Sequence, residues 1–129
     1  MTTKEATVSL RVFSAVLTCA EVSKFLGLQP THCHEKGDYI NKKSTAIRNE
    51  SLWIFSPELS GSLEHQLEAL ADVLLKHKDG ILAVASKATL EFYCGISTEN
   101  GQGNTFLSKS LMRKLLEIEV DLLIEYYLS

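Results

Sequence analysis

The chain has 129 residues, of which 45% are hydrophobic and 22% are charged, and its formal net charge is −3. This mixture is typical of a globular domain, and its shortage of Lys and Arg disfavours non-specific nucleic-acid binding without excluding a local basic patch. No apolar run reaches the roughly 18 residues of a membrane span, and the N-terminal residues lack a signal-peptide core, so we expect a single cytoplasmic domain over residues 1–129 with no membrane association.

The first two predicted elements are a strand and a short helix. Residues 7–13 alternate apolar and polar side chains, which is typical of a half-buried strand. Residues 20–26 then carry apolar side chains at helical spacing, and either Ser14 or Thr18 can begin this helix. Gly27 is expected to end the helix.

The middle of the chain predicts an irregular segment, an inner strand and the longest helix. No period appears over residues 29–50, and long loops without a period tend to be functional or mobile. Residues 51–56 (SLWIFS) are rich in strand-forming residues and have apolar side chains at both odd and even positions, which predicts an inner strand. Residues 63–78 carry the clearest apolar stripe at helical spacing, with Ser62 as its N-cap and Gly80 as its stop.

The last part of the chain predicts two strands, a helix and a closing strand. Residues 81–85 have the composition of a short buried strand, and residues 89–96 alternate more cleanly. Residues 97–105 form a polar loop rich in Gly and Asn that fits neither phosphate-loop motif. Ser108 caps the third helix, and residues 121–128 close the chain as an alternating strand.

The order of these elements is β-α-β-α-β-β-α-β. Strands with one polar side suit a single sheet whose other face is covered by helices. We therefore predict a two-layer α+β sandwich with a mainly antiparallel sheet of about five strands and helices on one face. The last strand, which carries Tyr126 and Tyr127, is a candidate edge of this sheet.

Several landmarks coincide in order along almost the whole chain. They are residues 26–31 (LGLQPT), 36–38 (KGD) and 51–56, the helix over 63–78, and the closing helix–strand pair. In their order and spacing they resemble the bacterial family catalogued as domain of unknown function 4279. The resemblance implies a small cytosolic protein without an established activity, so it supplies no catalytic residues.

Three cysteines are present, Cys19, Cys33 and Cys94, and no two of them form a CxxC pair. An odd number without such a pair argues against a disulfide framework, so we expect reduced thiols. Cys94 lies among alternating apolar residues and is expected to be a small core residue.

The densest group of potential metal ligands lies in residues 31–35 (THCHE). His32, His34 and Cys33 offer the donors that zinc prefers, and Asp38 is close behind them. We expect His32 and His34 on opposite sides of an extended segment, however, and Cys33 has no chelating partner nearby. A metal site at these three residues therefore competes with an ordinary polar surface loop, and we expect no bound cofactor.

The same segment suggests a nucleophile. Cys33 could be activated by His32 or His34, as in cysteine-based catalysis, but no oxyanion hole can be identified near it. We therefore assign no catalytic residue.

The 29–50 segment is also locally basic, through Lys36, Lys42, Lys43 and Arg48. Tyr39 and Trp53 could provide stacking surfaces beside these cations for single-stranded nucleic acid or a phosphate. The alternative is that Trp53 belongs to the core and that the lysines are solvated. The candidate ligand-binding residues are Asp38, Tyr39, Arg48 and Trp53.

Two classes of function follow from these patterns. The first is a non-enzymatic binding or interaction module with a protein partner, by analogy with small acidic immunity proteins. The second is a small-ligand or metal-binding protein, or an enzyme, that uses the loop over residues 31–48. A second copy of the chain is a further partner, paired through an exposed edge strand.

Overall fold

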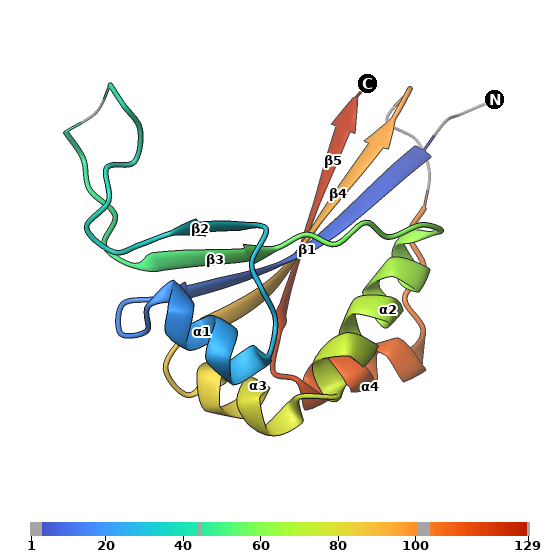
Figure 1. Cartoon of the computed structure of the whole chain (residues 1–129). Helices are drawn as coiled ribbons and strands as arrows, with labels where there is room; N and C mark the ends of the chain where they lie inside the picture. The colour runs from blue at the N-terminus through green and yellow to red at the C-terminus, as the bar shows by residue number, and fades with distance from the viewer. Residues whose placement is uncertain (1–3, 44, 101–103, 129) are drawn as a thin grey trace.

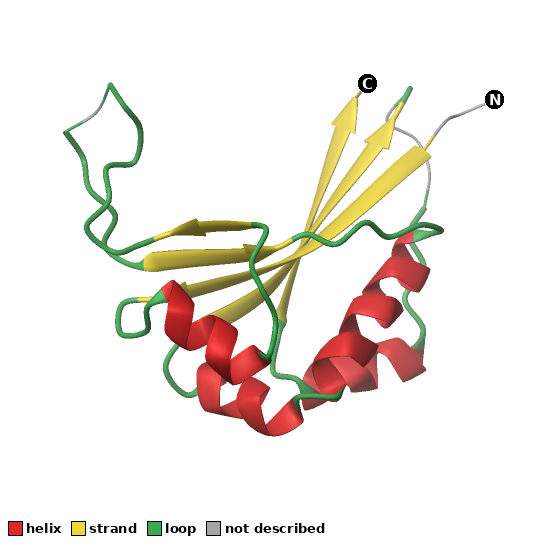
Figure 2. Ribbon diagram, in the orientation of Figure 1, coloured by secondary structure: helices red, strands yellow, loops and turns green. Residues whose placement is uncertain are grey.

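The computed structural model describes residues 4–43, 45–100 and 104–128. Within them the chain forms one five-stranded sheet with helices packed on one of its faces (Figures 1 and 2). This confirms the predicted α+β sandwich. The elements in chain order are β1 (Lys4–Ser14), α1 (Cys19–Leu26), β2 (His32–His34), β3 (Ser51–Phe55), α2 (Leu63–Leu75), α3 (Lys78–Ala85), β4 (Thr89–Thr98), α4 (Lys109–Glu117) and β5 (Asp121–Leu128).

The strands lie in the order β2-β3-β1-β4-β5. All pairings are antiparallel except that of β4 with β5. The parallel pair is possible because α4 carries the chain back along the sheet between these two strands. The prediction of a mainly antiparallel sheet is therefore confirmed, and β5 is an edge strand as expected.

The core lies between the sheet and the helices. On β1 the side chains of Val8, Leu10 and Val12 are buried, while the residues between them are not. Facing them, α2 buries the apolar stripe that the sequence indicated, including Leu67 and Leu70. Apolar burial on this scale is the main stabilising contribution in a domain of this size.

Local signals in the sequence set most helix ends. Thr18 begins α1 in a capping box with Glu21, and Gly27 ends it in the left-handed conformation with φ of 66°. The side chains of Ser62 and Ser108 accept hydrogen bonds at the beginnings of α2 and α4. All four residues play the roles that were predicted from the sequence.

The prediction of a strand over residues 81–85 was wrong, because this segment belongs to α3. The long helix also ends earlier than predicted, at Leu75, and Gly80 lies inside α3 rather than stopping α2. Gly80 has a packing role instead, since a Cβ atom there would lie 1.9 Å from the backbone oxygen of Phe25. Its missing side chain allows α3 to lie directly against the end of α1.

The segment that the sequence left irregular, residues 29–50, contains the short strand β2 and a projecting loop. The Gly- and Asn-rich loop after β4 falls partly on residues 101–103, which lie outside the described residues. In the portion of the chain that the structure describes, none of the helices has the length and hydrophobicity needed to span a membrane.

Candidate functional site

The described residues leave the sheet face opposite the helices without a helical layer, and we call it the open face (Figure 1). The pairing register places residues from all five strands on it. One row across the sheet consists of residues at matched positions, namely His32, Ile54, Arg11, Glu91 and Asp121. The basic side chains of this row therefore lie on β1 and β2, and its carboxylates lie on β4 and β5.

A connected group of polar side chains lies on the open face over β1, β4 and the edge strand β5. The hydroxyl groups of Tyr93 and Tyr127 both donate hydrogen bonds to Oε2 of Glu125, at 2.9 and 2.7 Å, and contact each other. The guanidinium of Arg11 lies 3.8 Å from the centre of the Tyr93 ring, a cation–π arrangement. Arg11 also forms a long ion pair of 3.9 Å with Glu91.

These contacts shift two pKa values in opposite directions. The hydrogen bonds from Tyr127 and Tyr93 lower the pKa of Glu125, because they favour its charged form. The hydrogen bonds of Tyr127 with Tyr93 and with Glu125 raise the pKa of the Tyr127 phenol. The group is therefore an ionised carboxylate that accepts hydrogen bonds from two phenol hydroxyl groups.

A projecting hairpin follows β2, and we call its described residues, 35–43 and 45–50, the arm. Figure 1 shows it rising on the side of the sheet opposite the helices. Backbone hydrogen bonds join its two limbs, from Gly37 N to Arg48 O, from Arg48 N to Asp38 O and from Ile40 N to Ala46 O, at 2.8–3.0 Å. Tyr39 and Ile47 form an antiparallel bridge between the Arg48–Asp38 and Ile40–Ala46 hydrogen bonds.

The predicted metal ligands do not converge in this structure. His32 and His34 pair with Ile54 and Leu52 and lie on the open face, whereas Cys33 pairs with Trp53 on the covered face. The expectation that the two histidines point to opposite sides was wrong, because residues two apart on a strand share a face. It is Cys33 between them that points the other way.

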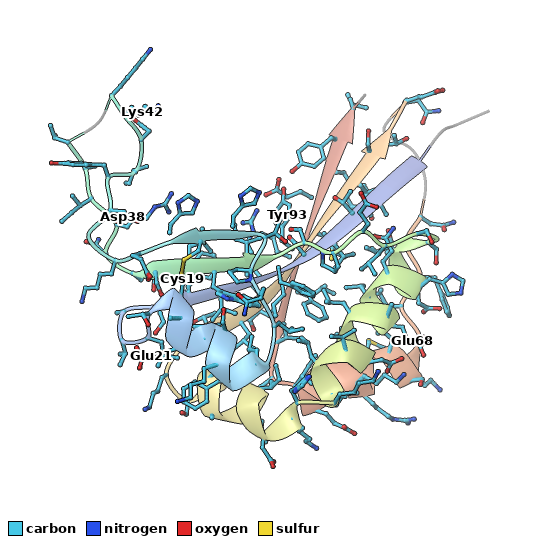
Figure 3. All side chains as sticks on the ribbon, viewed as in Figure 1. Cys19, Glu21, Asp38, Lys42, Glu68 and Tyr93 are labelled. Carbon is cyan, nitrogen blue, oxygen red and sulfur yellow. A yellow bond between two sulfur atoms is a disulfide. The ribbon has the colours of Figure 1, made fainter. Side chains whose placement is uncertain are left out.

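The expectation of three reduced thiols was also wrong. Cys33 forms a disulfide with Cys19, with Cα atoms 6.3 Å apart, and Cys94 is free and buried (Figure 3). No local motif in the sequence indicates this pair, because the two cysteines meet only once the fold has placed the first residue of α1 against β2. A Cys33 nucleophile would need a free thiolate, which the disulfide removes.

Among the described residues, the side chains that come close enough to share a metal ion are Cys19, Cys33 and Glu35, with ligand atoms within 4.8 Å of one another. The disulfide occupies both sulfur atoms of this group. Glu35 has a structural role there, because its Oε1 accepts a hydrogen bond of 3.0 Å from the backbone N–H of Cys19 at the beginning of α1.

The predicted ligand-binding residues are spread over separate places. Trp53 is fully buried and its Nε1 donates to Ser23 Oγ at 2.9 Å, so it lies in the core as the alternative interpretation had it. Asp38 accepts a hydrogen bond from the backbone N–H of Glu35 in the turn at the base of the arm. Tyr39 is exposed on the arm.

Arg48 lies at the base of the arm and is half-buried. Its Nε atom is buried and makes no hydrogen bond within the described part of the chain. Buried donors are nearly always paired in folded proteins. The N–H at this atom therefore lacks an acceptor that an atom outside the described residues would have to supply.

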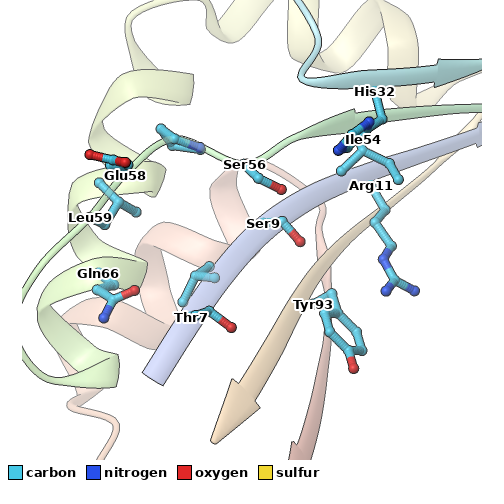
Figure 4. Close-up of a pocket in the computed structure, with 12 residues that line it drawn as sticks. Thr7, Ser9, Arg11, His32, Ile54, Ser56, Glu58, Leu59, Gln66 and Tyr93 are labelled. Carbon is cyan, nitrogen blue, oxygen red and sulfur yellow. The ribbon is translucent and has the colours of Figure 1, made fainter. Parts of the chain in front are cut away.

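The open face also holds a cleft of about 600 Å³ (Figure 4). Its floor comes from β1 and β3, and the segment over residues 56–59 forms a wall. His32 lines it, but the partners that the sequence suggested for this histidine, Glu35, Asp38 and Arg48, do not. Arg11 and Tyr93 line the cleft instead.

Sequence reasoning missed Arg11, Tyr93, Glu125 and Tyr127 as site residues. Each lies at a polar position of an alternating strand, and such positions are usually solvated. The sequence did offer one signal of a site. These polar strand positions carry an Arg and several Tyr, although Ser or Thr would suffice at a position that is only solvated. Only the register of the sheet shows that they meet.

The comparisons with known proteins identify a family but no function. No curated protein and no solved structure matches the chain. The sequence model of a domain of unknown function, DUF4279, matches residues 4–129, which is essentially the whole chain. The chain therefore belongs to the DUF4279 family.

Proposed function

We propose that this chain is a non-enzymatic binding module that engages an acidic protein partner through the outer half of the arm, residues 39–43 and 45–47. One observation carries the proposal. Three large hydrophobic side chains of this segment are exposed, with 67% of Tyr39, 50% of Ile40 and 53% of Ile47 accessible to solvent. Single exposed hydrophobic residues are normal, but a group of them on one projecting element is typical of an interaction surface.

The construction of the arm suits this role. Its limbs are joined by backbone hydrogen bonds along most of its length. A segment that is ordered before binding loses less conformational entropy when the partner arrives. Tyrosine is also among the residues that contribute most to affinity in protein interfaces.

The charges indicate the chemistry of the partner. The arm carries four cations and three carboxylates, a net charge of +1. Since the net charge of the whole chain is −3, the remaining residues together carry −4. Residues 39–47 include Lys42 and Lys43 and no carboxylate. A partner with an apolar recess rimmed by Asp and Glu would match this segment, and the opposite charges would speed its association.

Arg48 adds a second support. Its buried Nε lacks a hydrogen bond within the described residues, and a carboxylate or carbonyl oxygen of a partner docked at the base of the arm would supply the missing acceptor.

Affinity purification with a matched pair of triple variants tests the proposal. The arm variant is Tyr39→Ser/Ile40→Ser/Ile47→Ser. The control, Leu82→Ser/Met112→Ser/Leu116→Ser, removes three hydrophobic side chains that are exposed on the helical layer. The wild type and the control should retain one protein at equal stoichiometry, and the arm variant should lose it. The retained protein, once purified, should bind the wild type directly and bind Lys42→Glu/Lys43→Glu at least tenfold more weakly at low salt.

Several results would contradict the proposal. A partner that the arm variant retains, or that both triple variants lose equally, would place the binding surface elsewhere. An oligonucleotide that binds the wild type and not the arm variant would replace the protein partner by nucleic acid. A dimer that dissociates in the arm variant alone would replace it by a second copy of the chain.

A further inference from the structure

The cleft on the open face is separate from the arm and has a different character. It combines a floor of Ser9, Arg11 and Ile54 with a wall that includes Ser56 and Leu59 (Figure 4). Its volume of about 600 Å³ lies in the range of sites that hold small molecules. Hydroxyl groups, a guanidinium and apolar carbon therefore share one concave surface.

Arg11 is the group with the strongest directional chemistry in this cleft. Its guanidinium is held 3.8 Å above the centre of the Tyr93 ring, and its pair with Glu91 is 3.9 Å long, which exceeds the length of a hydrogen bond. Glu91 therefore attracts the guanidinium without forming a hydrogen bond with its N–H groups. A flat guanidinium fixed in this way is well suited to bind a carboxylate or a phosphate through two parallel hydrogen bonds.

The position of Tyr93 is itself fixed by the residues behind it. Its hydroxyl donates to Glu125 and contacts the hydroxyl of Tyr127. Gly95 leaves the room that Tyr127 needs, since a Cβ atom there would lie 3.3 Å from Cε2 of the Tyr127 ring. The phenol–carboxylate group is thus a support that orients Tyr93, which in turn orients Arg11.

His32 supplies a second donor. It lies in the same row of the open face as Arg11, with Ile54 between them. Two strand spacings separate the backbones of His32 and Arg11, about 10 Å, and this distance leaves space for a bound anion above Ile54. Glu58 is the carboxylate among the described lining residues, and it is exposed.

We propose that the cleft binds a small organic oxyanion, a carboxylate or a phosphate monoester. Arg11 forms the paired hydrogen bonds to the anion, and His32 donates from the other side. The hydroxyl groups of Ser9 and Ser56 hydrogen-bond to polar atoms of the ligand, and its apolar part lies against Ile54 and Leu59. Arg11 and His32 are binding residues, and Tyr93 is a positioning residue.

Calorimetric titration of the full chain tests this proposal with four probes: benzoate, phenyl phosphate, inorganic phosphate and the neutral benzamide. Benzoate or phenyl phosphate should bind saturably at one site, and benzamide should bind at least tenfold more weakly. Arg11→Gln should weaken the binding at least tenfold, because a charge-assisted pair of hydrogen bonds is lost. Arg113→Gln is the matched control on an exposed position of α4, and it should bind as the wild type does.

Two variants of Tyr93 separate positioning from simple structural damage. Tyr93→Phe keeps the ring under the guanidinium and should retain affinity within a few-fold, whereas Tyr93→Leu should weaken binding nearly as much as Arg11→Gln. Circular dichroism and melting temperatures will show that these variants on the open face are folded.

The outcomes also distinguish the source of the anion. Binding of benzoate alone would identify a carboxylate ligand, and binding of phenyl phosphate alone would identify a phosphate monoester. Binding of inorganic phosphate alone, equal binding of benzamide, unchanged binding by Arg11→Gln, or no heat with any anion would each overturn the proposal. None of these results depends on the arm, so the two proposals stand or fall separately.

Discussion

The two faces of the sheet differ more than any other two parts of this protein. Along β1, Val8, Leu10 and Val12 are buried against the helices, while Thr7, Ser9 and Arg11 point to the open face. The alternation of one strand thus divides its residues into those that hold the fold together and those that are free for recognition. We expect substitutions on the covered face to change stability, and substitutions on the open face to change binding.

Trp53→Ala should have the largest effect. The side chain is fully buried on the covered face and donates a hydrogen bond to Ser23, so its truncation leaves a cavity and an unpaired hydroxyl. We expect a loss of about 3–5 kcal/mol in the free energy of unfolding, measured by urea denaturation. Tyr127→Ala removes an aromatic ring from the open face and should cost far less. Equal losses would break the distinction between the faces.

Reduction of the Cys19–Cys33 disulfide should have the next largest effect. The bond closes a loop between residues 14 apart in the sequence, for which chain entropy gives about 3 kcal/mol. The melting temperature should then fall by about 10 °C in the presence of a reductant.

Thiol counting checks the same bond. The oxidised protein should show one thiol after unfolding, that of Cys94, whose pKa is raised to about 12 by burial and by the nearby Glu91. Three reactive thiols in protein taken directly from its cells would instead support the reducing compartment that the sequence suggested.

Two Gly→Ala substitutions, one in the helical layer and one on the open face, compare the two sides of the sheet with the same added methyl group. Gly80→Ala places a methyl group 1.9 Å from the backbone oxygen of Phe25, so α1 and α3 must separate, at a cost of about 1–3 kcal/mol. Gly95→Ala meets only the side chains of Thr7 and Tyr127, at 3.1 and 3.3 Å, which can shift. We expect its cost to stay below about 0.5 kcal/mol. A larger loss for Gly95→Ala than for Gly80→Ala would contradict the comparison.

The smallest expected effect concerns acid stability. The folded-state pKa of Glu125 lies below its ordinary value of 4.5 because Tyr127 and Tyr93 donate to the carboxylate. The ionised form therefore stabilises the fold above that value, and this contribution is lost as the pH falls through the folded pKa. The stability difference between the wild type and Glu125→Gln should be constant near neutral pH and shrink below pH 4.5. A difference that grows on acidification would contradict the hydrogen-bond assignment.

Most of the covered face could be predicted from the sequence, because the signals for its helices and strands are local. Thr18, Ser62 and Ser108 mark helix beginnings within a few residues, and the alternation in β1 identifies a half-buried strand. Such signals failed over residues 76–85, where Gly80 lies inside α3 instead of stopping α2 and where a short apolar run fits a buried helix as well as a buried strand.

The open face was harder to predict because it depends on contacts between distant residues. Arg11 and Tyr93 are 82 positions apart and meet only because β1 pairs with β4. The same limit holds for one contact on the covered face, since Cys19 and Cys33 meet only because the fold brings α1 against β2. No spacing in the sequence indicates either contact, whereas the exposed arm could be expected from the lack of a period over residues 29–50.

The central claim is that the open face, with Arg11 at its centre, is the ligand-binding side of the sheet. Backbone amide chemical shifts recorded during a titration with benzoate test it most directly. We expect saturable shifts confined to the strands that line the cleft, β1–β4, to residues 56–59 and to the neighbourhood of Gln66, with none in α3 or α4. Shifts centred on the helices, or no shifts at saturating benzoate, would contradict the claim.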